Sequence, residues 1–101
     1  HYKLTLFIPL KELHFLIDEN VTRQILGDNK YTKIYTDLSD FFQKKGWKKL
    51  AKNLYISSKE LEDGEINQLI VELKERYPYI SKCVKDLKQT DITEMSVIHT
   101  R

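Results

Sequence analysis

Apolar and polar residues alternate along the first segment of the chain, as they do in a β-strand. Between residues 2 and 8 every even position is apolar, and Pro9 follows, which cannot donate a hydrogen bond to a strand ladder. The pattern therefore predicts a strand that ends at Pro9. In residues 10–28, Leu13, Leu16 and Ile17 have helical spacing, but loop-type residues follow them. We expect a long connection there, with a short helix.

Two later segments repeat apolar residues at steps of three and four, which is typical of amphipathic helices. The first covers residues 30–45, where Asp28 or Asn29 can cap the start and Gly46 can end the helix in left-handed geometry. The second covers residues 65–77, begins after Asp63 and Gly64, and stops before Pro78. The sequence therefore predicts two helices of moderate length.

Three more segments are predicted to be mostly strand. Residues 47–51 and 54–57 favour a hairpin with a tight connection at Lys52 and Asn53. Residues 80–91 fit a turn of helix, whereas residues 84–92 equally fit a strand that pairs with the first one. A helical turn followed by a strand satisfies both patterns. The tail, residues 94–101, is expected to fray or to add to a neighbouring chain.

The resulting order, β-α-β-β-α-β, predicts an α+β fold of the ferredoxin-like, split βαβ type. Two helices would lie on one face of a four-stranded antiparallel sheet, and residues 1–101 would form one such domain. The other face of that sheet would be left open. Because an uncovered apolar face favours association, we expect a homodimer formed through that face or through a strand edge.

Composition indicates a globular protein and excludes several classes. Of 101 residues, 41% are hydrophobic and 32% charged, which is too apolar for a disordered chain. The apolar stretches are only a few residues long, far below the roughly 20 that span a bilayer, so we expect no membrane association. Cys83 is the single cysteine and cannot form an internal disulfide, which favours the cytoplasm. We expect its thiol to be buried and inert.

A cluster of cations interrupts an otherwise balanced charge pattern. The net charge is only +2, but residues 43–52 hold five lysines around Trp47 and no acid. The members of the cluster are Lys44, Lys45, Lys48, Lys49 and Lys52. Such a group can follow a phosphate backbone while the indole stacks on a base. It equally fits a helix C-terminus followed by a lysine-rich strand edge that discourages aggregation.

Four segments of the chain resemble the virulence-associated protein D (VapD) family. They are residues 31–38, Gly46-Trp47, residues 53–55 and residues 80–87, and the similarity extends over residues 31–100. The matches include an aromatic-x-x-x-Tyr-x-Asp helix, here Tyr31 to Asp37, and an aspartate in the last strand, here Asp86. The resemblance implies the dimeric ferredoxin-like fold of the second CRISPR-associated protein. It also implies descent from endoribonucleases that cleave messenger RNA, some of them in toxin–antitoxin modules.

The chain departs from the family at the positions that carry the chemistry. Phe7 stands where the family's first strand has an aspartate, and Asn53 stands where the hairpin has a serine. The candidate catalytic residues that remain are Asp86, Asn53 and Tyr55. Because a divalent ion needs more than one oxygen ligand, we predict neither a metal site nor a cofactor, and Asp86 also fits an exposed carboxylate paired with a neighbouring lysine. His14, His99 and Asp37 are expected to have ordinary surface roles.

Two classes of function follow from these observations. The first is a VapD-like RNA-interacting protein of endoribonuclease ancestry, with weak or lost nuclease activity because of Phe7. The lysine cluster and Trp47 would then bind the nucleic acid. The alternative is a non-catalytic dimeric interaction module, or an antitoxin-like adaptor that binds a protein partner. Whether the chain is an enzyme, an endoribonuclease in particular, is left open by the sequence.

Overall fold

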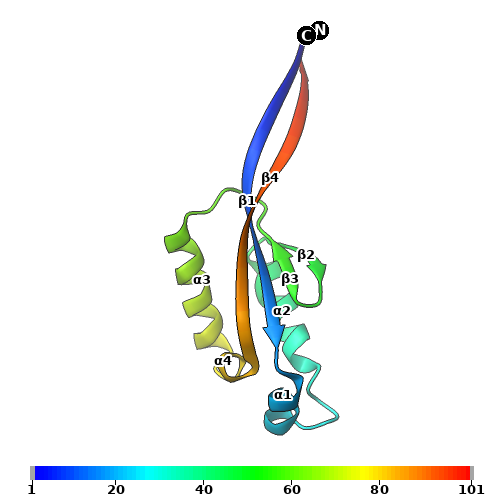
Figure 1. The fold of residues 1–101 in the computed structure, drawn as a ribbon, viewed down its shortest axis with the longest axis vertical. Helices are drawn as coiled ribbons and strands as arrows, with labels where there is room; N and C mark the ends of the chain where they lie inside the picture. Colours follow the sequence, from blue (N-terminus) through cyan, green and yellow to red (C-terminus); the bar gives the residue numbers. More distant parts are fainter. Residues whose placement is uncertain (1, 101) are drawn as a thin grey trace.

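The computed structural model describes residues 2–100, and within them the side chains of residues 9–93. Strands and helices alternate in the order expected for a split βαβ fold (Figure 1). The elements are β1 (Tyr2–Ile17), α1 (Glu19–Leu26), α2 (Lys33–Lys44), β2 (Lys48–Ala51), β3 (Leu54–Ile56), α3 (Asp63–Arg76), α4 (Ile80–Cys83) and β4 (Val84–Thr100).

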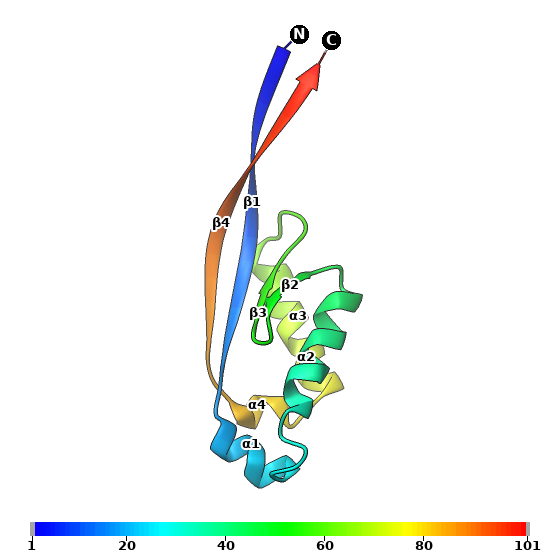
Figure 2. The same cartoon turned by 90° about the vertical axis from the view of Figure 1, so that its right-hand side faces the viewer.

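The strands form one four-stranded sheet in the order β2-β3-β1-β4, with every neighbouring pair antiparallel. Helices α2 and α3 pack on the same side of this sheet, and no other element described here covers the opposite side (Figure 2). The fold class expected from the sequence, α+β with a ferredoxin-like arrangement, is confirmed. Between β1 and α2, the short helix α1 occupies the end of the sheet beside α4.

The core fills the space between the sheet and the two long helices. Phe42 lies at its centre, stacked on Tyr55 at 4.8 Å between ring centroids and in edge contact with Trp47 at 5.3 Å. From the sheet, Leu13 and Phe15 of β1 contribute fully or almost fully buried side chains. The predicted burial of Cys83 is confirmed, since its thiol is completely enclosed.

Strands β1 and β4 extend beyond the rest of the sheet as a two-stranded arm (Figure 1), and the molecule measures 59 × 26 × 20 Å. Their register runs without interruption from Tyr2↔Thr100 to Leu16↔Asp86. The expectation that residues 94–101 fray is therefore wrong for residues 94–100. Its alternative, that the tail adds to a neighbouring chain, stays a prediction, because β4 is an edge strand. At the base of the arm, Lys11 Nζ lies 3.2 Å from Asp63 and 2.5 Å from Asp91, which ties β1 to α3 and β4.

Pro9 does not end the first strand, contrary to expectation. The Lys11 N–H and carbonyl both bond to Ser57, on the β3 side of β1, and alternation along the strand turns the nitrogen of Pro9 to that same side. At that level β3 has already ended, because its register with β1 covers only Glu12 to His14. The proline therefore removes no ladder hydrogen bond, as at an edge strand.

Residues 10–17 are consequently strand, and the long connection predicted for residues 10–28 is wrong in its first half. A short helix does lie within residues 10–28, but it is α1 and not the segment around Leu13, Leu16 and Ile17 that suggested it. Helix α1 begins where Asp18 accepts a hydrogen bond from the Val21 N–H at 3.1 Å. The helical spacing of Leu13, Leu16 and Ile17 misled because β1 buries side chains on both of its faces. Two-sided burial removes the simple alternation that identifies a strand.

The helix ends agree with the sequence better than the helix starts. Gly46 follows α2 with a φ of +85°, the predicted left-handed exit. Asp28 and Asn29 do not cap α2, since the residue before the helix is Thr32 and it makes no side-chain capping bond. The predicted tight connection at Lys52 and Asn53 joins β2 to β3. Within the described residues, no helix is long and apolar enough to cross a membrane.

Candidate functional site at the open sheet face

The register of the strands defines which side chains lie on the uncovered side of the sheet. Leu13 and Phe15 belong to the core under the helices, so the alternate positions of β1 and their partners in register face away from the helices. We call this surface the open face. Its described members are Leu10, Glu12, His14 and Leu16 of β1, Leu54 and Ile56 of β3, and Asp86, Lys88, Thr90 and Ile92 of β4.

Asn53, a predicted catalytic residue, lies at the edge of this face in the β2–β3 turn. Its backbone carbonyl accepts a hydrogen bond from the Phe15 N–H at 2.8 Å. Its side-chain nitrogen lies 3.0 Å from the Phe15 carbonyl oxygen and 3.1 Å from Nε2 of His14. Asn53, which precedes the first residue of β3, therefore extends the β1–β3 pairing by one residue. It also fixes the orientation of the histidine ring.

These contacts decide which ring nitrogen of His14 carries the proton. The Phe15 carbonyl can only accept, so the amide nitrogen of Asn53 must face it. The second N–H of that amide then points to Nε2 of His14, which must accept. The neutral ring consequently carries its proton on Nδ1. One nitrogen of the imidazole is occupied and the other is a donor.

Asp86, the second predicted catalytic residue, is exposed and stands opposite Leu16 in the register. The residue opposite His14 is Lys88, two positions further along β4, which places Asp86 on the diagonal of the histidine on the same face. Its Oδ1 accepts a hydrogen bond from the Leu87 N–H at 2.9 Å. Neither of the lysines beside it, Lys85 or Lys88, forms an ion pair with it among the described side chains.

Tyr55, the third predicted catalytic residue, belongs to the core instead. Its side chain is completely buried on the helix side, and its hydroxyl donates to the Lys52 carbonyl at 3.3 Å. Burial raises the pKa of this hydroxyl to about 12, despite a neighbouring hydrogen bond with Ser39 that lowers it. The prediction that Tyr55 contributes to the chemistry is contradicted by this position, because substrate cannot reach a fully enclosed phenol.

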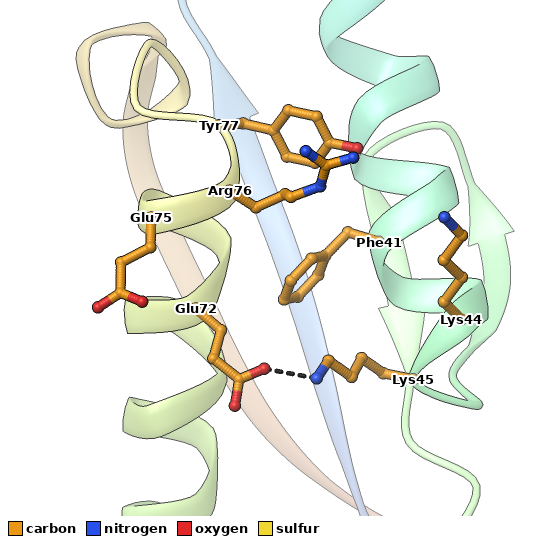
Figure 3. A pocket seen from close by; sticks show the side chains of 7 residues that line it. All are labelled: Phe41, Lys44, Lys45, Glu72, Glu75, Arg76 and Tyr77. Atoms are coloured by element: carbon orange, nitrogen blue, oxygen red, sulfur yellow. Dashed lines mark hydrogen bonds and ion pairs between the residues drawn. The ribbon is translucent and has the colours of Figure 1, made fainter.

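The predicted nucleic-acid-binding cluster does not form a single surface. Trp47 is only 6% exposed and packs against Phe42, so its predicted stacking on a base is wrong. Lys44 and Lys45 end α2 and lie in the helix layer, where the Lys45 ammonium pairs with Glu72 of α3 at 2.5 Å (Figure 3). A cation near a helix C-terminus that bridges to another helix stabilises the fold.

The remaining lysines of the cluster lie along the sheet. Lys48 is opposite Ile56 in the register and so adjoins the open face, whereas Lys49 is opposite the buried Tyr55. All four residues of β2, which is an edge strand, are exposed. Lys52 occupies the β2–β3 turn beside Asn53, with its ammonium 4.5 Å from the ring centre of Tyr35. Lys48 and Lys52 are therefore the part of the cluster that a ligand on the open face can reach.

Sequence reasoning did not assign His14, Lys85 or Lys88 to the candidate site. The sequence carried no clear signal for them, because the alternation of β1 is obscured; only the observed burial of Leu13 and Phe15 shows that His14 faces the other way. Among the described residues, no group of three or more histidine, cysteine, aspartate or glutamate side chains comes together to hold a metal ion. The side chain of Phe7 lies outside the described side chains, and its backbone pairs with Met95.

No protein-family model matches the chain, and the search of curated proteins gave no match. The resemblance to the VapD family therefore rests on the residues quoted above. The structure places Asp37 on α2, Asn53 in the β2–β3 turn and Asp86 in β4.

Proposed function

We propose that the chain is an RNA-interacting protein of VapD-like endoribonuclease ancestry, in which nuclease activity is weak or lost. RNA would bind across the end of the open face that contains His14 and Asn53. The observation that carries this proposal is the hydrogen bond between the Asn53 amide and His14 Nε2 at 3.1 Å. It favours binding over cleavage, for the following reason.

Cleavage of RNA through its 2′-hydroxyl needs a base with a free lone pair within hydrogen-bond reach. On the open face, the described candidates are His14, Asp86 and Glu12. His14 has no free lone pair in this arrangement, because Asn53 occupies Nε2 and Nδ1 carries the proton. Neither Asp86, which is exposed, nor Glu12 belongs to a group of three or more histidine, cysteine or acidic side chains among the described residues. A solvated carboxylate is a weak base for this step.

The positive charges around His14 and Asn53 favour binding of a polyanion. Lys88 is opposite His14, Lys85 and Lys52 lie at the same end of the sheet, and Lys48 is at the edge formed by β2. None of these four lysines forms an ion pair with a described side chain. Cations without acidic partners gain most from phosphate groups, because a polyanion releases counterions when they bind.

Salt dependence of binding to a labelled single-stranded RNA tests the proposal directly. Four phosphate contacts correspond to a slope of about −3 in a plot of log affinity against log salt. Changing Lys48 and Lys88 together to glutamine should make the slope less steep by about 1.4 units. The matched control changes Lys44 and Lys74, which lie in the helix layer, and should leave it unchanged. Binding that does not vary with salt would contradict the proposal.

Cleavage is tested separately with the same RNA. We expect the purified chain to degrade it slowly or not at all, with or without added magnesium or manganese. Rapid degradation that disappears in the Asp86→Ala variant, purified in parallel, would overturn the loss of nuclease activity. It would leave the RNA interaction in place.

A second candidate function, a dimeric interaction module, is favoured by a separate part of the open face. Leu10, Leu50, Ile56 and Ile92 line a hollow of about 510 Å³ there, and Leu50 is 47% exposed. Next to it, β4 is an edge strand whose backbone groups are free to pair with another strand. A second copy of the chain would cover both features.

A further inference from the structure

A hollow of about 410 Å³ opens beside Asn53, between the end of β1, the β2–β3 turn and the first turns of α1 and α2. We propose that it is the subsite for one ribonucleotide of the bound RNA, with the phosphate held by Lys52 and Lys85 and a ribose hydroxyl held by Asn53. This inference rests on the proposed function and names the chemical group that the site would recognise.

The hollow combines an apolar wall with a cationic rim. Leu16 and Ile17 form the wall, while Lys52 and Lys85 approach from the hairpin turn and from the start of β4. Neither ammonium group pairs with an acid among the described side chains. Two unpaired lysines around a hollow of this size provide the charge-assisted donors that a phosphate requires.

The one acid of the rim, Glu19, is already engaged. It accepts a hydrogen bond from the Tyr35 hydroxyl at 2.9 Å. Like any tyrosine, Tyr35 is protonated at neutral pH, and burial, followed by Glu19, raises its pKa further, to about 12. The Lys52 ammonium lies over the ring of Tyr35, 4.5 Å from the ring centre. Tyr35 therefore directs the carboxylate of Glu19 and holds the ammonium of Lys52 in place before any ligand binds, which lowers the entropy lost on binding.

Asn53 supplies a different contact. Both of its N–H groups are used within the protein, so it cannot donate to a phosphate. Its Oδ1 accepts from no described donor, and no described side-chain polar atom is buried without a partner, so this oxygen reaches solvent. A carbonyl oxygen beside a phosphate site can accept from a sugar hydroxyl. The 2′-hydroxyl, which DNA lacks, is the group that would distinguish RNA here.

Titration of the isotope-labelled protein with cytidine 3′-monophosphate, followed by NMR, tests the subsite. The nucleotide should shift the backbone amides of Asn53 and Lys85, and the deoxy nucleotide should bind more weakly. Lys52→Gln together with Lys85→Gln should reduce affinity about tenfold. The control pair, Lys44→Gln with Lys74→Gln, removes the same charge from the helix layer and should have no effect.

An unchanged affinity for the nucleotide in the Lys52 and Lys85 variant would overturn the subsite, as would equal affinity for the deoxy nucleotide. RNA binding measured on the same samples separates this inference from the proposed function. Intact RNA binding without nucleotide shifts would overturn the subsite alone. Nucleotide binding without salt-dependent RNA binding would overturn the proposed function and support the subsite.

Discussion

The Asn53 amide donates both of its N–H groups inside the protein, and this one side chain determines the chemistry of His14. In Asn53→Asp the side chain can only accept, so the ring proton of His14 should move from Nδ1 to Nε2. Two-bond nitrogen–proton correlation spectra distinguish the two tautomers. The variant also places a carboxylate against the Phe15 carbonyl, which should cost about 1–3 kcal/mol of stability.

A wild-type spectrum that already shows the proton on Nε2 would contradict this arrangement of the amide. The control is Asn20→Asp, which makes the same chemical change at an exposed position in α1. It should alter neither the tautomer nor the free energy of unfolding appreciably.

Tyrosine hydroxyls connect the elements around α2. Tyr79 donates to the buried carboxylate of Asp37 at 2.5 Å, and Lys33 lies 2.6 Å from the same oxygen. Asp37 is thus a partly shielded link between α2 and the turn before α4, where an ordinary surface role was expected. Burial, followed by the hydrogen bond to Asp37, raises the pKa of Tyr79 far above its usual value.

These phenols make stability sensitive to alkaline pH. The pKa values of Tyr35 and Tyr55 are raised to about 12, above the value of about 10 in an unfolded chain. The unfolded state therefore loses protons first, so the free energy of unfolding should hold to about pH 10 and fall from there toward pH 12. Urea titrations across this range should show a smaller fall in Tyr35→Phe. An unchanged fall would contradict the assignment to Tyr35.

At the scale of the elements, two glycines offer a matched comparison. Gly46 ends α2 with a φ of +85°, whereas Gly64 lies in the first turn of α3 without a positive φ. An added methyl group would meet only Ser58 Oγ at 3.8 Å at Gly46, and nothing within 4 Å at Gly64. Gly46→Ala should therefore lose about 1–2 kcal/mol through backbone strain alone. Gly64→Ala should gain about 0.5–1 kcal/mol, and urea unfolding measures both.

How far the elements could be predicted depended on whether one face or two were buried. Helices α2 and α3 each bury a single stripe, and their periodicity placed them within a few residues of their observed bounds. Strand β1 buries Leu10 on one face and Leu13 on the other, so no period was visible. Whether Pro9 ends the strand depended on where β3 ends, and the local sequence around Pro9 does not show this.

The candidate site was predictable in position but only partly in composition. Asn53 and Asp86 were identified, and both adjoin the open face. Trp47 and Tyr55 were assigned to the site although both pack on Phe42, because an aromatic residue in a polar stretch does not reveal which side of the sheet it faces. His14 was missed because the sequence did not show that it faces the open side of the sheet.

At the scale of the whole molecule, the uncovered side of the sheet is where association is expected. Leu50, 47% exposed, adjoins the hollow on the open face, and Val71, 45% exposed, lies on α3. If two copies pair through the open face, Leu50→Lys should shift light-scattering mass toward the monomer. Val71→Lys, with nearly the same exposure, should leave the mass unchanged. A wild-type protein that stays monomeric at millimolar concentration would contradict the dimer.

The pairing of Tyr2 with Thr100 has a mechanical consequence. A force that pulls the two ends of the described chain apart acts across the β1–β4 ladder, so its hydrogen bonds break singly, beginning at the tip. Rupture of this kind needs little force until it reaches Lys11, whose ammonium is held by Asp63 and Asp91. In an optical trap the arm should therefore yield first and separately, followed by a stiffer event as the body opens.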